Sequence, residues 1–413
     1  MGMNETPSAN RVHIGIFGKR NAGKSSMINA VTGQNLAIVS EIKGTTTDPV
    51  KKAMELLPLG PVLMIDTPGL DDGGPLGRMR VEKAYQALNQ TDIAILVVDG
   101  EDFSGKEEFD AIMHPLTARF AEKKIPYIIA VNKSESLTEE KKAQIREAFL
   151  EDAPLLFVSA KTGRNIPELK ECIAKLAPEE HTQLKLVKDL LAPFDVAVLV
   201  VPIDSSAPKG RLILPQQQVI RDCLEAGAVP VVTKETGLRE TLKLLSGKPK
   251  LVITDSQAFE RVAKDTPEDV FLTSFSILFS RYKGNLKQQV LGAEALLELE
   301  DGDTVLISEG CTHHRQCGDI GTVKLPRWIL EFTGKKLEFA FTSGTQFPED
   351  LSEYALVVHC GGCMLNEKEM KRRLNCARAG GVPMTNYGTA IAKMHGILDR
   401  SLEIFQSVFR EGL

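Results

Sequence analysis

The stretch VHIGIFGKRNAGKSSMINAVT, residues 12–32, decides the fold of the first part of the chain. A short apolar run predicts a buried strand, and the pattern Gly-x-x-x-x-Gly-Lys-Ser follows it and leads into a helical pattern. Such glycines let backbone N–H groups face phosphate oxygens, and the positive end of the helix adds attraction. We expect Lys24 to reach the β- and γ-phosphates of a nucleotide and Ser25 to bind Mg²⁺. Taken alone, the pattern leaves open a glycine-rich turn without a ligand.

Four further motifs follow in the order that a guanine-nucleotide site requires. They are Gly44-Thr45-Thr46-Thr47-Asp48, Asp66-Thr67-Pro68-Gly69, Asn132-Lys133-Ser134-Glu135 and Ser159-Ala160-Lys161. We expect the Thr46 hydroxyl to bind the metal, Asp66 to hold Mg²⁺ through water, and the Gly69 N–H to sense the γ-phosphate. Because five motifs occur in register, the glycine-turn alternative becomes negligible, and the sequence predicts GTP binding and hydrolysis.

Over residues 11–176 these motifs resemble those of translation-factor-class GTPases, especially the TrmE and Era group. The resemblance implies that Asn132 and Lys133 frame the guanine and that the backbone near Ala160 contacts its O6 atom. The residues that it places at the nucleotide are Asn21, Ala22, Gly23, Lys24, Ser25, Ser26, Asp66, Gly69, Asn132, Lys133, Glu135, Ser159, Ala160 and Lys161.

Two residues depart from the pattern of that group. Glu135 stands where the group has Asp, and its longer side chain must fold back, so we expect weaker selectivity for guanine. Leu70 follows the Asp-Thr-Pro-Gly motif in place of Gln, so no side chain there can orient the attacking water. Relatives with this replacement use a K⁺ ion held partly by an Asn at the place of Asn21. The resemblance therefore implies slow, K⁺-stimulated hydrolysis.

Length and composition predict a soluble protein of several domains. A chain of 413 residues is too long for one hydrophobic core, and its net charge of -5 argues against a nucleic-acid binder. No apolar run reaches the length of a membrane span, and the first ten residues are polar, without the core of a signal peptide. We therefore expect a cytoplasmic protein.

The order of the segments predicts an α/β fold with a P-loop G domain and two further α/β domains with parallel sheets. Apolar strand-sized runs alternate with helical patterns along the chain. We expect the G domain at 1–176, a linking or dimerising domain at 177–265, and a third domain at 266–413. The middle segment has no nucleotide motif.

Seven cysteines are present, and five of them follow residue 310. An odd number does not indicate a disulfide framework. Two groups of soft ligands each follow a predicted strand, so they are expected at one sheet edge. They are Cys311-Thr312-His313-His314 and His359-Cys360-Gly361-Gly362-Cys363. Spacing alone leaves open ordinary buried cysteines, a structural zinc site with three Cys and one His, and a [4Fe–4S] cluster.

The arrangement Cys-x-His, a long gap, then His-Cys-x-x-Cys, behind a TrmE-like G domain, is similar to the [FeFe]-hydrogenase maturation GTPases of the HydF family, over the whole chain. The resemblance implies a [4Fe–4S] cluster on Cys311, Cys360 and Cys363, and a homodimer. Candidates for the fourth iron site are His313, His314, His359 and water. It further implies a scaffold that receives a diiron precursor, built with two radical-SAM maturases, and passes it to the apo-hydrogenase.

Two rival functions are a TrmE-like GTPase of RNA modification and a GTP-dependent switch with structural zinc. The acidic net charge and the two-part Cys/His set weigh against the first rival. Cys317 and Cys376 lie outside the family motif and are expected to be ordinary cysteines. The basic groups around Lys324 and at Lys371-Arg372-Arg373 are expected to be solvated.

Overall fold

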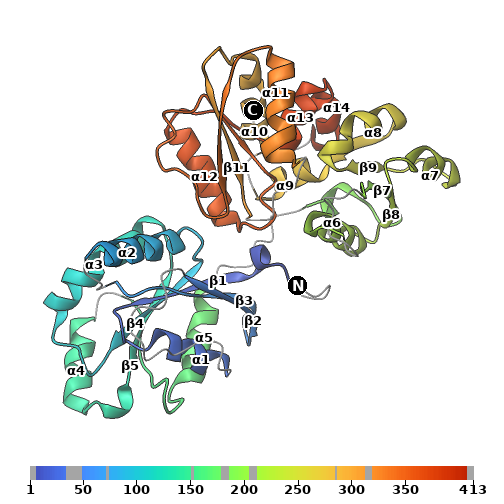
Figure 1. The fold of residues 1–413 in the computed structure, drawn as a ribbon. Helices are drawn as coiled ribbons and strands as arrows, with labels where there is room; N and C mark the ends of the chain where they lie inside the picture. The colour runs from blue at the N-terminus through green and yellow to red at the C-terminus, as the bar shows by residue number, and fades with distance from the viewer. Residues whose placement is uncertain are drawn as a thin grey trace. The chain divides into compact units, whose positions relative to one another are not determined.

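The computed structural model describes residues 6–33, 49–70, 74–149, 153–177, 186–203, 212–283, 286–311 and 319–406. The chain forms two compact units, Met1–His181 and Thr182–Leu413. Each unit consists of sheets flanked by helices, as the ribbon in Figure 1 shows. The α/β fold class expected from the sequence is confirmed.

The N-terminal unit contains one six-stranded sheet with the strand order β2-β3-β1-β4-β5-β6. Its strands are β1 (Val12–Gly18), β2 (Val50–Leu56), β3 (Gly60–Asp66), β4 (Ile93–Asp99), β5 (Tyr127–Asn132) and β6 (Leu155–Phe157). Its helices are α1 (Lys24–Thr32), α2 (Gly74–Leu88), α3 (Lys106–Glu122), α4 (Glu139–Ala148) and α5 (Ile166–Leu176).

Both faces of this sheet are buried, as the apolar strand runs predicted. Ile14 and Ile16 of β1 pack into one core, whereas Phe17 packs into a second core on the other side. The sheet is mixed, because β2 pairs antiparallel with β3. The reversal occurs at Gly60, whose φ of 91° suits glycine. Most of β2 is exposed or half-buried, so its weak apolar pattern did not predict a strand.

The C-terminal unit contains two four-stranded sheets in which all pairings are parallel. The second sheet has the order β10-β9-β7-β8, with β7 (Val196–Val200), β8 (Val229–Thr233), β9 (Leu251–Thr254) and β10 (Phe271–Ser274). The third sheet has the order β12-β11-β13-β14, with β11 (Thr304–Glu309), β12 (Glu338–Ser343), β13 (Leu356–His359) and β14 (Met384–Asn386). The helices are α6 (Leu214–Glu225), α7 (Leu238–Leu244), α8 (Phe259–Asp265), α9 (Phe275–Lys283), α10 (Leu286–Glu294), α11 (Leu325–Thr333), α12 (Glu367–Ala379), α13 (Tyr387–Met394) and α14 (Leu398–Leu402).

Segments beyond residue 265 complete the second sheet and its core. Strand β10 lies beyond residue 265, the boundary expected from the sequence, and pairs with β9. Helix α9 follows β10 directly, and its Leu278 lies in the same core as Leu398 and Phe405 from the end of the described chain. The C-terminal residues therefore help to cover the second sheet.

None of the helices within the described residues is long and apolar enough to cross a membrane.

Candidate nucleotide site and cysteine centre

The phosphate-binding loop lies between the end of β1 and the start of α1. Asn21 and Gly23 adopt left-handed backbone conformations, with φ of 62° and 89°. A Cβ atom on Gly23 would lie 2.2 Å from Asn132 Nδ2, so the second motif glycine is required by close approach as well as by its conformation. Lys24 Nζ donates to the carbonyl oxygens of Gly18, at 3.0 Å, and Lys19, at 2.7 Å. The amine is thus held over the loop that would surround the phosphates.

Two of the expected Mg²⁺ ligands lie together beside this loop. Ser25 Oγ donates to Asp66 Oδ2 at 2.7 Å. Burial raises the pKa of Asp66, and the bond from Ser25 and the charge of Lys24 oppose this shift. A Cβ atom on Gly69 would lie 2.9 Å from the Arg20 backbone nitrogen, so the segment after Asp66 touches the loop. Thr46, the expected third metal residue, lies outside the described residues.

Asn132 connects the phosphate loop to the loop after β6. Its Nδ2 donates to Ala22 O at 3.0 Å, and its Oδ1 accepts from Ala160 N at 3.0 Å. The amide is buried, so each of these bonds replaces water that the site excludes. One side chain therefore holds the phosphate side and the base side of the expected site in register.

Lys133 and Glu135 flank this connection. Lys133 Nζ lies 2.5 Å from Asp99 Oδ2 at the end of β4, and this ion pair fixes the end of the lysine side chain. A hydrogen bond with Ser159 lowers the pKa of Glu135, and Lys161 and Lys133 add to the shift. The carboxylate at position 135 is thus ionised and already bound to Ser159, the first residue of the last motif. Among the other expected nucleotide residues, Ser26 lies in the first turn of α1.

The cysteine centre lies at the carboxyl edge of the third sheet. Strands β11 and β13 are parallel neighbours, with Ser308 beside His359, so Cys311 and Cys360 follow at the same edge. Cys360 Sγ accepts from two backbone amides, Gly310 N at 3.0 Å and Gly362 N at 3.4 Å. The strand register therefore brings Cys311 and Cys360 to the same edge.

A buried lysine supports the loop that contains Cys360 and Cys363. Burial raises the pKa of both thiols, that of Cys363 to about 11. Lys283, at the end of α9, donates to the carbonyl oxygens of Leu365, at 2.9 Å, and Cys363, at 3.4 Å. Burial lowers the pKa of Lys283 to about 8. Sequence analysis did not identify Lys283, because a lysine at the end of a helix is usually solvated.

In the part of the chain that the structure describes, no group of three or more His, Cys, Asp or Glu side chains could hold a metal ion as placed. Cys311 and Cys360 follow neighbouring strands at one edge, and Cys363 follows three residues after Cys360. The other candidates of the first cysteine group, His313, His314 and Cys317, fall outside the described residues. Cys376 lies on α12 with its Sγ 3.8 Å from Arg372 Nη1.

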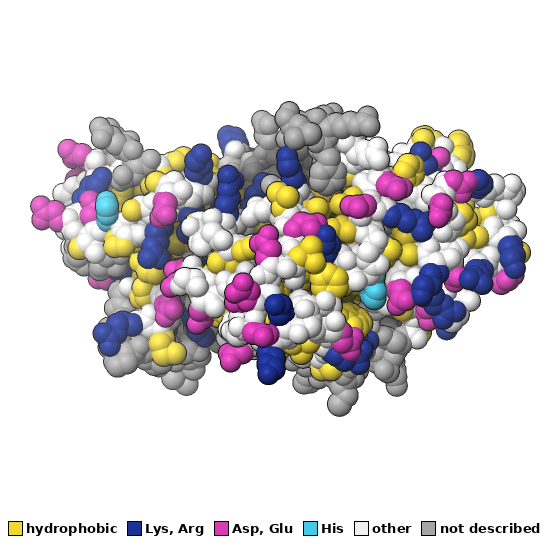
Figure 2. Space-filling model, turned by 90° about the horizontal axis from the view of Figure 1, so that it is seen from above, with side chains coloured by type: hydrophobic (Ala, Val, Ile, Leu, Met, Phe, Trp, Pro, Cys, Tyr) yellow, Lys and Arg dark blue, Asp and Glu magenta, His cyan; other side chains and the backbone are white. Residues whose placement is uncertain are grey.

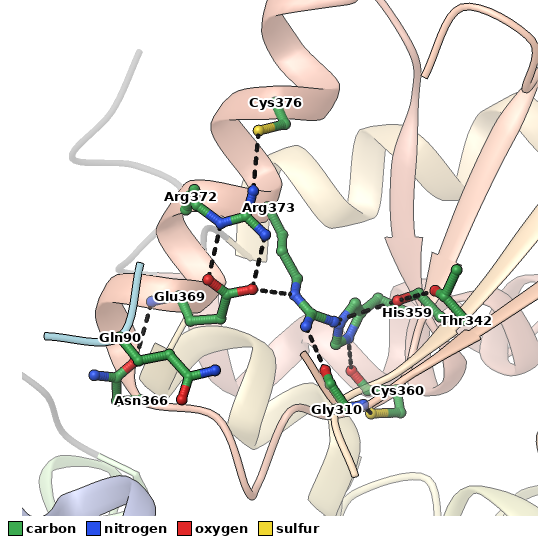
Figure 3. Close-up of polar contacts among 12 residues, drawn as sticks. Gln90, Gly310, Thr342, His359, Cys360, Asn366, Glu369, Arg372, Arg373 and Cys376 are labelled. Atoms are coloured by element: carbon green, nitrogen blue, oxygen red, sulfur yellow. Dashed lines mark hydrogen bonds and ion pairs between the residues drawn. The ribbon is translucent and has the colours of Figure 1, made fainter. Parts of the chain in front are cut away.

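His359, the last residue of β13, is fully buried, and its ring lies beside Arg373 (Figure 3). Its Nδ1 lies 2.6 Å from Cys360 O, and its Nε2 lies 2.9 Å from Arg373 Nη1. Burial lowers the pKa of His359 to about 3, and the charge of Arg373 adds to the effect. The imidazole is therefore neutral near pH 7, with both nitrogens engaged.

Arg373 is also fully buried, which corrects the expectation that Lys371-Arg372-Arg373 form a solvated group. On α12 it belongs to the buried stripe of Met370, Leu374 and Ala377, at helical spacing. The helical spacing of these residues in the sequence indicated that Arg373 could be buried. Its charge led instead to the prediction of a solvated side chain.

The connecting role of Asn132 predicts the effect of an isosteric change. In Asn132→Asp the acceptor for Ala160 N remains, but the donor to Ala22 O is lost and two acceptors face each other. We expect GTP affinity to fall about 10- to 100-fold, as when a buried acceptor loses its partner. Isothermal titration with GTP and a non-hydrolysable analogue measures this. Asn165→Asp, on the neighbouring loop, is the control. Unchanged affinity in Asn132→Asp would show that the connection is dispensable.

Three models of known protein families match successive parts of the chain. Residues 186–284 match the hydrogen maturase F dimerization domain, and residues 287–404 match the hydrogen maturase F tetramerization domain. Residues 13–133 match a model described as a 50S ribosome-binding GTPase.

Curated relatives match a smaller part of the chain. GTPase Der of Wolinella succinogenes is 37% identical over 181 residues, which is 42% of this chain and 37% of Der. The tRNA modification GTPase MnmE of Heliobacterium modesticaldum is 32% identical over 162 residues, 39% of this chain and 33% of MnmE. An uncharacterized protein of Methanocaldococcus jannaschii is 34% identical over 179 residues, 39% of this chain and 94% of that protein. This chain thus spans well under two thirds of Der and MnmE. With a GTPase domain followed by both maturase domains, the chain belongs to the hydrogen maturase F family.

Proposed function

We propose that this protein is a GTP-hydrolysing scaffold of [FeFe]-hydrogenase maturation. It holds a [4Fe–4S] cluster on Cys311, Cys360 and Cys363, receives a diiron precursor made with radical-SAM maturases, and passes it to the apo-hydrogenase. The observation that carries the proposal is the position of the three cysteines. They follow two parallel neighbouring strands, within the region that matches the hydrogen maturase F tetramerization domain.

The residues at this edge fit an iron–sulfur cluster. Backbone amides of Gly310 and Gly362 donate to Cys360 Sγ, and such bonds stabilise a thiolate and tune a cluster. Burial keeps Cys360 and Cys363 protonated without metal, so binding must release their protons. When bound through three thiolates, a cluster supplies one iron with an exchangeable ligand, which suits temporary attachment of a cargo. His313, His314 and water remain candidates for that position.

At the nucleotide site, Lys24, Ser25 and Asp66 bind the phosphates and Mg²⁺, together with Thr46. The Gly69 N–H faces the γ-phosphate. Asn21 lies in the loop with the backbone conformation described above and would hold part of a K⁺ shell. Leu70 offers no group to orient water, so hydrolysis is slow and stimulated by K⁺.

A role in RNA modification, suggested by the name of the MnmE relative, has less support. The net charge is -5, and on the face shown in Figure 2 the described basic and acidic side chains are interspersed. Binding of nucleic acid requires a concentrated basic surface. A structural zinc ion on the same cysteines is the other alternative, and metal analysis separates it from the cluster.

Metal analysis after strictly anaerobic purification tests the cluster. We expect about four irons per chain with matching sulfide, and an EPR signal after reduction. Cys363→Ala should lose most of the iron while GTP turnover stays within about twofold of wild type, because the thiol lies far along the chain from the nucleotide motifs. Cys376→Ala, a cysteine outside the motif, is the matched control and should keep its iron. One zinc per chain without iron would rule out the cluster and leave the GTPase assignment intact.

Loss of the phosphate-binding amine tests the separation of the two sites. Lys24→Ala should lower GTP turnover about 100-fold or more, because it removes the charge that faces the transferred phosphate. The same sample should retain wild-type iron content. Turnover is followed by phosphate release with and without K⁺, and Lys175→Ala, on the exposed side of α5, is the control. Iron loss in Lys24→Ala would contradict independent sites.

Self-association, implied by the names of the two matched maturase domains, is proposed to use the surface around β8. This strand is at the edge of the second sheet, and Val229 and Val232 are 44% and 46% exposed. Leu224, at the end of α6, and Phe194 add exposed apolar area, and Phe194 N bonds Gly227 O just before β8. An apolar sheet edge of this kind favours pairing with a second copy.

A charge on that edge tests the interface. Val232→Glu should halve the particle mass measured by light scattering after gel filtration, because a carboxylate would be buried between copies. Met79→Glu, at an apolar residue of the N-terminal unit that is 56% exposed, should leave the mass unchanged. An unaltered mass in Val232→Glu would place the interface elsewhere.

A further inference from the structure

A buried chain of polar contacts runs from α12 to the backbone of Cys360 (Figure 3). Glu369 Oε1 accepts from Arg373 Nε at 2.8 Å, and Arg373 Nη1 lies 2.9 Å from His359 Nε2. His359 Nδ1 lies 2.6 Å from Cys360 O. All three side chains are at most 1% exposed. Such a concentration of polar groups in a core is unusual and must be fully bonded to be tolerated.

The guanidinium of Arg373 connects several segments of the third sheet. Besides Glu369 and His359, it donates from Nη1 to Ser308 Oγ of β11 at 3.3 Å and from Nη2 to Gly344 O after β12 at 2.6 Å. Its carbon centre lies 5.0 Å from the centroid of the Phe347 ring. Arginine presents its donors in a rigid fork, so these contacts fix the fork against β11 and β13 at once.

The fork also determines the tautomer of His359. Arginine always donates, so His359 Nε2 must accept and must lack a proton. In the neutral imidazole the proton is then on Nδ1, which donates to Cys360 O. Both ring nitrogens are therefore used, one as acceptor and one as donor.

The two faces of β13 separate His359 from the cysteine thiol. Val357 packs in the core beneath α12 with Leu374, whereas Val358 packs in the core on the other face, against which Cys360 also packs. Side chains alternate along a strand, so His359 lies on the α12 face and the Cys360 thiol on the other. Coordination of iron by His359 would require it to leave Arg373 with an unpaired buried donor.

We propose that Arg373 and His359 are positioning residues for Cys360, and that His359 is not an iron ligand. The side chains of Glu369, Arg373 and His359, here called the relay, hold the Cys360 carbonyl on one face of the end of β13. This places Sγ on the other face, within reach of the Gly310 and Gly362 amides. The relay itself is independent of metal, and only its consequence for the cluster rests on the proposed function.

Thiol reactivity in the metal-free full-length protein tests the relay directly. Cys360 is partly exposed, so its alkylation by iodoacetamide can be timed by peptide mass spectrometry. We expect Arg373→Met to accelerate alkylation of Cys360 about tenfold or more, because local opening of the strand end becomes easier. Cys223, buried in the core of the second sheet, is the internal reference and should react at the wild-type rate.

Matched variants separate the relay from general loosening of α12. Arg372→Met removes the neighbouring arginine, which also bonds Glu369 but has no contact with His359 among its described bonds, and should leave Cys360 at the wild-type rate. His359→Leu should accelerate the reaction, and His359→Asn, which keeps a donor near the Cys360 carbonyl, should restore part of the protection. Equal Cys360 rates in wild type, Arg373→Met and His359→Leu would overturn the proposal, as would equal acceleration in Arg372→Met.

Pulsed EPR of the reconstituted, reduced protein tests the ligand assignment. Wild type and His359→Asn should show the same ¹⁴N couplings, because no nitrogen of His359 binds iron. Disappearance of a strong coupling in His359→Asn would identify it as a ligand and overturn the proposal. If wild-type protein takes up no iron, the proposed cluster function fails, and the alkylation rates alone decide the relay. Should Arg373→Met not fold, the two His359 variants provide the same comparison.

Discussion

The parallel pairing of β11 with β13 is the constraint on which the cysteine centre depends. With Ser308 beside His359, the chain leaves both strands at the same edge, and Cys311 and Cys360 follow within one or two residues. A shift of one residue in β13 would exchange the faces of His359 and Cys360. Arg373 stabilises the correct register, because its fork bonds Ser308 of one strand and His359 of the other. A buried arginine is tolerated there because Glu369 compensates its charge.

The nucleotide site is organised by the same principle with different groups. In the first sheet the functional loops also leave the carboxyl ends of parallel strands, and a buried side chain connects them. Asn132 bridges Ala22 and Ala160 through an amide that offers one donor and one acceptor. The third sheet uses an imidazole and a guanidinium for the corresponding task. In each case a buried polar side chain fixes the position of the loop that holds expected ligand-binding residues.

Sequence reasoning predicted the alternation of strands and helices and the loop between β1 and α1, because those features follow from local spacing. It expected Ser25 and Asp66 each to hold Mg²⁺, but not the hydrogen bond that joins the two side chains. It missed β2, since an exposed edge strand has no continuous apolar run. It also missed Arg373 and Lys283, because charged side chains are usually solvated and their burial depends on partners distant in sequence. The i, i+4 spacing of Glu369 and Arg373 within an apolar stripe was visible, but only the fold shows which face of α12 is inward.

Lys283 connects the elements of the two C-terminal sheets. Lys283 is the last residue of α9, the helix that follows β10 of the second sheet. Its Nζ donates to the carbonyl oxygens of Cys363 and Leu365, in the loop that follows β13 of the third sheet. A backbone segment that contains two of the three cysteines is therefore supported from both sides, by Arg373 through His359 and by Lys283 directly. The dimerization match ends at residue 284, immediately after this lysine, and the tetramerization match begins at residue 287. Because a buried ammonium must keep its acceptors, displacement of α9 would require the Cys363 loop to follow or leave Lys283 unpaired. The second sheet thereby restricts the geometry of the cysteine edge, although it contributes no thiol to it.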